Sequence, residues 1–418
     1  MSESDKNSPG TGAAAAGDST VARAVSWDAF LSTYLPAMIL ALGTGIALPA
    51  LPKLAQSFNV DFAVASSVIT AFVVGNLVGT LPAGWLIDRF GRKPVLIAGP
   101  LLSAATAFLV VMAESFPQLV VLRLLNGIAV QLWLMARLAA ISQGAAAGQR
   151  GRQVSWMFGM DSAGKLSGPV IGGYIAAAFG PRAPFLVYAV LALIALAPIA
   201  WYARRIPHHV ASAAGRRSGL SPAVLRDLIM PRLPYFGVAL FAGLTRGPVY
   251  ADLLHLYAAF AYKLGPQAIG YLATGASMIS LPIGFAAGWA MDRFGRKHTM
   301  VPGFTGASIA MLALAASAFL ELSLTWYVVL FFFAILTQSL TGGSIQTVGA
   351  DVAPAEARGT FLGLWRFTGQ GGATISPIIF ALVAHHLNYG TAFLIVAACA
   401  MAVAVLLIFY VPETRTEQ

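Results

Sequence analysis

The sequence predicts an all-α integral membrane protein in which twelve membrane-spanning helices form two pseudo-symmetric six-helix bundles. Composition is the first reason: 58% of the 418 residues are hydrophobic, 10% are charged, and the mean hydropathy is +0.76. Soluble domains are roughly 25% charged, so a soluble enzyme is not expected. The apolar residues gather in runs of about twenty, a length that crosses a bilayer. Because backbone groups in lipid must pair within their own segment, these runs are expected to be helices.

Twelve apolar runs can be placed along the chain, and the longest polar stretch lies in the middle. Their approximate bounds are 27–50, 63–87, 94–113, 118–143, 154–179, 183–203, 233–261, 267–291, 299–320, 324–349, 360–386 and 390–411. The sequence therefore predicts an N-terminal bundle over 26–203, a central cytoplasmic loop over 204–232 and a C-terminal bundle over 233–418. Residues 1–25 are polar and rich in Ser, Gly and Ala, and we expect them to form a disordered cytoplasmic tail.

Lysine and arginine lie almost entirely on one side of these spans. That side carries Lys6, Arg23, Arg89, Arg92, Lys93, Arg150, Arg152, Arg204, Arg205, Arg216, Arg217, Arg226, Arg232, Arg293, Arg296, Lys297, Arg358 and Arg415. The opposite side carries Lys53, Arg182 and Lys263. Cytoplasmic loops are enriched in Lys and Arg, so both termini are predicted to be cytoplasmic, in a plasma membrane such as the bacterial inner membrane. The net charge of +10 is then a matter of topology and not of nucleic-acid binding.

An internal repeat supports two related halves. The ten residues 84–93 read Gly-Trp-Leu-Ile-Asp-Arg-Phe-Gly-Arg-Lys, and residues 288–297 read Gly-Trp-Ala-Met-Asp-Arg-Phe-Gly-Arg-Lys. A second echo relates 150–169 to 358–377 through shared Arg-Gly, Gly and Pro positions. Parallel repeats of this kind are expected when two bundles pack about an axis along the membrane normal.

The repeated Gly-x-x-x-Asp-Arg-x-Gly-Arg-Lys pattern resembles the signature loop of the Major Facilitator Superfamily, and the resemblance covers all of the chain except the tail. It implies alternating access between two bundles, a monomer and no cofactor. It also implies gating by the two loops, with Asp88 contacting the start of span eleven near Thr360 in the outward-open state. The residues concerned are Gly84, Asp88, Arg89, Gly91, Arg92 and Lys93, with Gly288, Asp292, Arg293, Gly295, Arg296 and Lys297 in the second half. The alternative is a loop that serves only topology and contact with lipid headgroups.

Two further segments resemble elements of exporting, proton-antiport branches of that family. Span five contains Gly164, Gly168, Pro169 and Gly172 in a Gly-x-x-x-Gly-Pro-x-x-Gly pattern. Glycines four residues apart allow helices to touch backbone to backbone, and the proline would bend the helix. Span one contains Gly-x-Gly-x-x-x-Pro-x-x-Pro at 43–52. Tight packing, as in any membrane protein, is the alternative reading of both.

Ionisable residues inside the spans are costly and therefore candidates for the transport pathway. They are Arg123, Arg137, Asp161, Lys165, Arg246, Asp252, His255 and Arg366. Arg123 lies in Arg-x-x-Asn-Gly, similar to a family pattern whose arginine is linked to proton transfer, although the family has Gln in place of Asn126. Approximate depth predicts a cluster of Arg137, Asp161 and Lys165, because the last two are four apart on one helix face.

This cluster suggests a coupling mechanism. An anion that draws the two cations away from Asp161 would leave its carboxylate free to take a proton. The alternative is a static salt bridge that holds spans four and five together. In span seven, Asp252 is either a second protonation site or an outer hydrogen-bonding pair with His255. Arg246 is expected near the midplane, and Arg366 either lines the cavity or joins a cytoplasmic ion-pair network.

Five cations against two carboxylates predict a net positive cavity and an anionic or zwitterionic small-molecule substrate. The chain has no P-loop, so transport is expected to be driven by an ion gradient or to run downhill. The titratable groups favour protons, and sodium is the alternative coupling ion. We therefore predict proton-coupled export of a small organic anion, metabolite or drug-like molecule. The alternatives are a proton-coupled uptake symporter for an organic acid and a transporter-like receptor that moves nothing. No metal site is expected, because Cys399 is the single cysteine.

Overall fold

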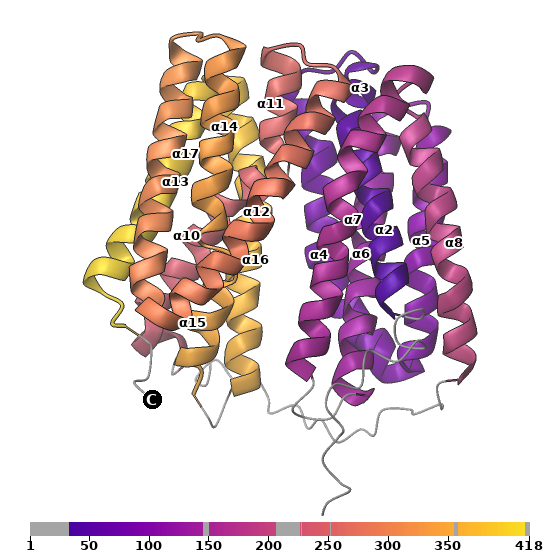
Figure 1. Ribbon diagram of the computed structural model, residues 1–418, viewed down its shortest axis with the longest axis horizontal. Helices are drawn as coiled ribbons and strands as arrows, with labels where there is room; N and C mark the ends of the chain where they lie inside the picture. Colours follow the sequence, from indigo (N-terminus) through magenta and orange to yellow (C-terminus); the bar gives the residue numbers. More distant parts are fainter. Residues whose placement is uncertain are drawn as a thin grey trace, which may run out of the picture.

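The computed structural model describes residues 33–144, 150–205, 226, 228–250, 252–354 and 358–413. These residues form helices joined by short turns, and no strand occurs among them. Figure 1 shows two bundles side by side, one built from the first half of the chain and the other from the second half. The all-helical architecture predicted from composition is thus confirmed for the residues that the structure describes.

The N-terminal bundle consists of α2 Leu35–Ala47, η2 Leu48–Ala50, α3 Leu51–Gln56, α4 Phe62–Phe90, α5 Arg92–Val111, α6 Phe116–Gly144, α7 Arg150–Phe179 and α8 Ala183–Arg205. The C-terminal bundle consists of η4 Met230–Arg232, α10 Leu233–Tyr250, α11 Leu253–Ala261, α12 Pro266–Phe294, α13 Arg296–Phe319, α14 Leu324–Ser339, α15 Ser344–Val352, α16 Arg358–His386 and α17 Tyr389–Phe409.

Ten helical segments of the described residues are long and apolar enough to cross a membrane. The predicted spans 154–179 and 233–261 are not among them. Helix α7 is long, but its sequence carries Arg150, Arg152, Asp161 and Lys165. The prediction of one continuous helix over 233–261 is wrong, because α10 and α11 are separate helices and Asp252 between them has a left-handed backbone, with φ of 59°. Ten apolar spans establish a multi-pass membrane protein, and the count of twelve stays a prediction.

The repeated loops have the same backbone in both halves. Helices α4 and α12 end at Gly91 and Gly295, whose φ angles are 80° and 103°. Only glycine takes such angles without a steric penalty, which explains why this position is glycine in both repeats. The next helix begins one residue later in each half.

The two bundles meet at the end of the helices away from these loops. One apolar cluster contains Phe62 and Ile69 of α4 together with Tyr257 of α11 and Phe380 of α16. Polar contacts reinforce this end: Gln56 donates to the Ala259 carbonyl at 3.2 Å. The other large clusters each lie within one bundle. In Figure 1, α3 and α11 adjoin at the top, where the bundles come together.

The same helix faces are exposed near the repeated loops. On α4, Ile69 is buried, whereas Thr80, eleven residues and about three turns further along, is exposed. On α16, Pro377 is buried, whereas Arg366, eleven residues earlier, is exposed. The structure is therefore closed at the end with few basic residues and open at the basic end.

Candidate functional site

A central cavity of about 450 Å³ lies between the two bundles. Its polar lining from the N-terminal bundle is Thr44, Arg123, Ser162, Lys165 and Tyr188. Its polar lining from the C-terminal bundle is Asp252, His255, Ser277, Ser280, Gln338 and Ser339. This volume falls within the range of pockets that hold drug-sized molecules. The N-terminal wall carries cations, and the C-terminal wall carries one carboxylate, one imidazole and neutral polar groups.

The structure brings Arg137 and Asp161 together behind this cavity. Both Nη atoms of the guanidinium lie 3.0 Å from the two carboxylate oxygens, a bidentate pair between α6 and α7. Arg137 is 4% exposed and Asp161 18% exposed, and the guanidinium also lies over the Trp133 ring at 4.9 Å. Two parallel charge-assisted hydrogen bonds fix this geometry tightly.

Lys165 does not pair with Asp161, contrary to the predicted helical ion pair. No ion pair or hydrogen bond of Lys165 occurs among the described residues, and its side chain is exposed along the central cavity. The physical reason is that Arg137 occupies both carboxylate oxygens of Asp161. A small pocket of about 80 Å³ is nevertheless lined by all three residues. The predicted cluster is thus a part-buried Arg137–Asp161 pair with an adjacent cation that faces the cavity.

Arg123 lies on the cavity wall against aromatic and amide neighbours. Its guanidinium carbon is 4.5 Å from the Phe72 ring centroid, a cation–π geometry. Its Nη1 atom donates to the Asn126 side-chain oxygen at 3.4 Å, and Asn126 in turn donates to Thr106 at 3.0 Å. The asparagine that departs from the family pattern therefore orients Arg123 through a chain of hydrogen bonds.

Asp252 and His255 lie together where the closed end of the cavity begins. The carboxylate oxygen of Asp252 is 3.5 Å from Nδ1 of His255, and both residues line the cavity. His255 is 6% exposed and packs against the Phe331 ring. Asp252 and His255 are therefore close together, as predicted. The prediction placed them on one face of a continuous helix, whereas Asp252 lies at the break between α10 and α11. No group of three metal-ligating side chains occurs among the described residues.

Two further predicted pathway residues line neither the central cavity nor the small pocket beside it. Arg246 of α10 donates to the carbonyl oxygen of Thr341 and, at 3.0 Å, to its hydroxyl. Thr341 follows the C-terminus of α14, where carbonyl groups lack partners within the helix, so Arg246 stabilises the break between α14 and α15. Arg366 is exposed and forms neither an ion pair nor a hydrogen bond within the described residues.

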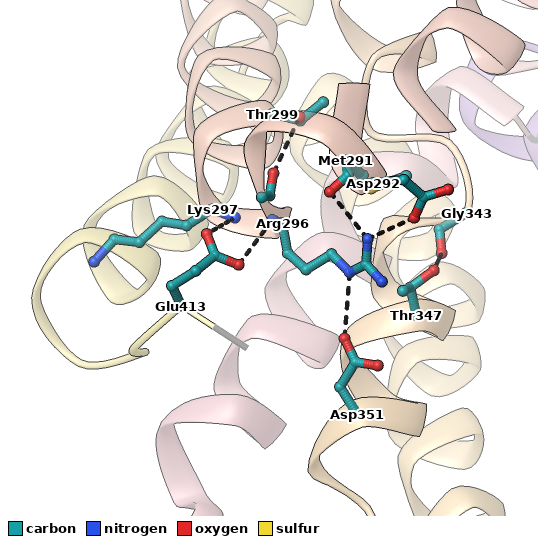
Figure 2. Close-up of polar contacts among 10 residues, drawn as sticks. Met291, Asp292, Arg296, Lys297, Thr299, Gly343, Thr347, Asp351 and Glu413 are labelled. Carbon is teal, nitrogen blue, oxygen red and sulfur yellow. Dashed lines mark hydrogen bonds and ion pairs between the residues drawn. The ribbon is translucent and has the colours of Figure 1, made fainter. Parts of the chain in front are cut away.

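The C-terminal repeated loop is held by a network of polar contacts (Figure 2). The Arg296 guanidinium contacts Asp292 at 2.7 Å and Asp351 at the end of α15 at 3.3 Å. The Glu413 carboxylate accepts hydrogen bonds from the backbone N–H groups of Arg296 and Lys297 at 2.8 and 2.9 Å. These contacts join the loop to two other segments of the same bundle.

The N-terminal repeated loop has a different environment. Asp88 is exposed and makes no hydrogen bond or ion pair within the described part of the chain. The side chain of Thr360, its predicted partner, lies outside the described residues, so this contact stays a prediction. Arg89 lies over the Trp85 ring at 5.2 Å, just as Arg293 lies over the Trp289 ring at 5.3 Å.

The glycines of span five pack α7 directly against α2. A Cβ atom added at Gly168 would lie 2.8 Å from the Gly45 Cα, and one added at Gly164 would lie 2.7 Å from the Leu42 nitrogen. The elements noted in spans one and five therefore contact each other. Pro169 lines the central cavity on the same helix. Close packing of this seam is observed, whereas bending at Pro169 during transport stays a prediction.

Sequence reasoning missed the neutral polar side chains of the cavity. Gln338, Ser280 and Tyr188 all line it, whereas the predicted pathway residues are all ionisable. The signal was present, because Thr-Gln-Ser at 337–339 interrupts an apolar run and is separated by two residues from Gly342 and Gly343. Polar groups at this depth also need partners.

The family model described as "Major Facilitator Superfamily" matches residues 33–262 and 236–418. The class B tetracycline resistance protein of Escherichia coli is 24% identical over 357 residues, covering 83% of this chain and 86% of that protein. Multidrug resistance protein 2 of Bacillus subtilis is 23% identical, covering 82% and 87%. Among solved structures, the partially occluded inward-open xylose transporter XylE of E. coli aligns with a TM-score of 0.70 at 18% identity, covering 93% of this chain and 99% of that one.

Proposed function

The chain belongs to the Major Facilitator Superfamily, and we propose that it is a proton-coupled exporter of a small organic anion, metabolite or drug-like molecule. One observation supports this most directly. Arg123 and Lys165 line a cavity between the bundles, while the buried Arg137–Asp161 pair lies beside Lys165. Unpaired cations bind a carboxylate or similar anion, and the carboxylate behind them provides a place for a proton.

The proposed topology has twelve spans with both termini and the loop 204–232 in the cytoplasm. The basic repeated loops then face the cytoplasm and contact anionic lipid headgroups, and the closed end faces outside. The proposed location is the bacterial inner membrane, which the bacterial relatives support. We propose a monomer in which residues 26–203 and 233–418 move as two bodies.

The proposed coupling step uses competition for cations. In this structure both Nη atoms of Arg137 hold the two carboxylate oxygens of Asp161. An anion that enters the cavity beside Lys165 attracts Arg137 as well. Partial loss of that pair raises the cost of a buried unpaired charge, and protonation of Asp161 relieves it. Anion and proton then bind in the same state, which is the coupling of the symport alternative; antiport requires instead that Asp161 release its proton before the anion binds. Asp252 and His255 form the proposed second site, nearer the closed end.

The relatives, and not the cavity, indicate the direction of transport. A cavity open at the basic end receives solute from the cytoplasm during export and releases it there during uptake. Export is favoured because the two bacterial relatives above are named as resistance proteins. A proton-coupled symporter for an organic acid uses the same fold and is the alternative outcome of the test.

The test measures proton movement in everted membrane vesicles that are energised to be acidic inside. Candidate organic anions, together with tetracycline as a zwitterion, are added to vesicles containing the wild type, Asp161→Asn or Glu114→Gln. Glu114 is an exposed loop residue, so its variant controls for loss of a carboxylate elsewhere. We expect at least one compound to dissipate the gradient with the wild type and with Glu114→Gln, but not with Asp161→Asn.

Two outcomes would contradict this proposal. If no compound dissipates the gradient, yet proteoliposomes accumulate an organic acid under an inward proton gradient, the protein is a symporter. If Asp161→Asn behaves like the wild type, the Arg137–Asp161 pair is a structural contact between α6 and α7 and carries no proton.

A further inference from the structure

Gln338 is a buried amide without a hydrogen-bonding partner on the wall of the central cavity. The residue is 1% exposed, and its side-chain nitrogen and oxygen have almost no accessible surface and no hydrogen-bonding partner among the described residues. A solute in the cavity therefore reaches the amide only after the side chain turns toward it. It lies one residue before the end of α14 and lines the cavity. Buried polar groups in native proteins are rarely left unpaired, and each exception needs an explanation.

The neighbouring hydroxyl groups are directed elsewhere. Ser339 contacts the Ile335 carbonyl at 2.6 Å and the Ser280 hydroxyl at 3.1 Å. Thr341 directs its hydroxyl to the backbone oxygen of Gln338 at 2.8 Å. Thr337 bonds back to carbonyl groups of its own helix. The side-chain amide therefore has donors and an acceptor that the adjacent residues of α14 do not use.

We propose that Gln338 is the binding site for a neutral group of the transported solute that both donates and accepts hydrogen bonds, such as a primary carboxamide. The primary amide of glutamine carries two N–H donors and one carbonyl acceptor in a plane. A primary carboxamide presents the complementary pair and can therefore form two hydrogen bonds at once. This inference rests on the proposed function and narrows its substrate class.

The cavity residues of the N-terminal bundle indicate which group lies at the other end of the solute. Arg123 and Lys165 belong to the N-terminal bundle, whereas Gln338 belongs to the C-terminal bundle. A solute with a carboxylate at one end and a carboxamide at the other contacts both bundles. Such a ligand couples the two walls, because its binding depends on groups that move with different bundles. The predicted class is an anionic or zwitterionic molecule with a separate neutral carboxamide.

Binding of two matched probes to the purified full-length protein tests this inference. The probes are 4-carbamoylbenzoate and 4-isopropylbenzoate, which share the carboxylate and the ring but differ in hydrogen-bonding capacity at the other end. We expect the wild type to bind the carboxamide roughly tenfold more tightly, the effect of two net hydrogen bonds. Gln338→Leu should abolish this preference, and Gln370→Leu, an exposed glutamine of α16 outside the cavity lining, should retain it.

Three results would overturn the inference. They are equal binding of both probes by the wild type, binding of neither probe, and a preference that persists in Gln338→Leu. The binding measurement needs no proton gradient. If the wild type prefers the carboxamide probe but shows no gradient-driven transport, the proposed proton coupling is rejected. The inference about Gln338 is then still supported.

Thermal unfolding without ligand gives a second, independent test. If the amide is unpaired in the empty cavity, leucine of similar size removes the cost of its burial, and Gln338→Leu should melt at a higher temperature than the wild type. Gln370→Leu should melt close to the wild type. A lower melting temperature for Gln338→Leu would mean that water or protein already satisfies the amide, and the inference would fail.

Discussion

The two halves share a ten-residue loop but surround it differently. In the C-terminal half, Asp351 and Glu413 hold the loop at 288–297. The second echo relates the halves by an offset of 208 residues (358 − 150), which assigns Gln143 and Arg205 to the positions of these two acids. At these two positions the N-terminal half therefore has no carboxylate. The same motif is therefore held by two carboxylates in the C-terminal half. In the N-terminal half, its Asp88 has no hydrogen-bonding partner among the described residues.

The same contrast extends to the membrane interior. The offset of 208 residues relates Arg137 to Ile345 and Asp161 to Gly369. Ile345 belongs to an apolar cluster with Trp365, so the C-terminal bundle has apolar packing where the N-terminal bundle has an ion pair. The stability of a bundle does not require a charge at this place. This comparison is the structural reason for proposing that the ion pair acts in transport.

The packing between corresponding pairs of helices also differs between the two halves. In the N-terminal half, Gly75 brings α4 against α6, and an added Cβ would lie 3.0 Å from the carbonyl carbon of Leu124. The loops are related by an offset of 204 residues (288 − 84), which assigns Ile279 to this position in α12. Ile279 lines an apolar groove of about 490 Å³ beside Phe332 and Leu336 of α14. A branched side chain thus takes the place of this glycine in the second pair of helices.

The largest expected effect comes from breaking the ion pair on one side. Arg137→Ile leaves the Asp161 carboxylate buried without its partner, and we expect a loss of about 3–5 kcal/mol in unfolding free energy. The double variant Arg137→Ile/Asp161→Ala has an apolar arrangement like that of the other half and should recover most of the lost stability. It should still fail to dissipate the proton gradient in the vesicle assay. Thermal and denaturant unfolding of the single and double variants measures this. A double variant as unstable as Arg137→Ile alone would show that the pair contributes to folding in a way that apolar packing does not replace.

A smaller loss of stability should follow from adding one methyl group where α4 packs against α6. Gly75→Ala places a Cβ against the backbone of α6, and overpacking of this kind costs about 1–3 kcal/mol. The matched variant Ile279→Ala enlarges a groove that is already open, so we expect a change near 0.5 kcal/mol. Melting temperatures of both variants in the same detergent decide the comparison. If the two variants lose equal stability, the glycine seam is less rigid than its geometry indicates.

The smallest expected effect concerns the braced loop. Glu413→Ala removes the acceptor for the first backbone N–H groups of α13, a role like that of a helix N-cap, and should cost about 1 kcal/mol. Asp88→Asn should leave stability unchanged within about 0.5 kcal/mol, because the exposed carboxylate has no partner in the described state. Hydrogen exchange of the amides at the start of α13 provides the local readout. Unchanged exchange in Glu413→Ala would show that the carboxylate does not hold this helix end.

Features that depend on neighbouring residues along the chain were predictable. Apolar run lengths gave helices near the predicted bounds, and Gly91 and Gly295 matched positions that need a positive φ. Span seven was predicted as continuous because its composition is apolar throughout, but the left-handed Asp252 interrupts it. The spacing of four residues predicts that Lys165 pairs with Asp161. In the structure Arg137, which lies on another helix, donates hydrogen bonds to both carboxylate oxygens of Asp161 instead. Local spacing indicates which partners are possible, and competition among helices selects one of them.

The sequence by itself determined the class of protein, the repeat and the family, because hydrophobic run length, loop charge and the Gly-x-x-x-Asp-Arg-x-Gly-Arg-Lys pattern are local properties. Only the tertiary structure decided which buried polar groups share the cavity. It placed Lys165 along the cavity, used Arg246 to stabilise a helix break and left the Gln338 amide unpaired. The physical reason is that each of these outcomes depends on which side chains from distant helices come within hydrogen-bonding distance. That distance follows from how the helices pack against one another.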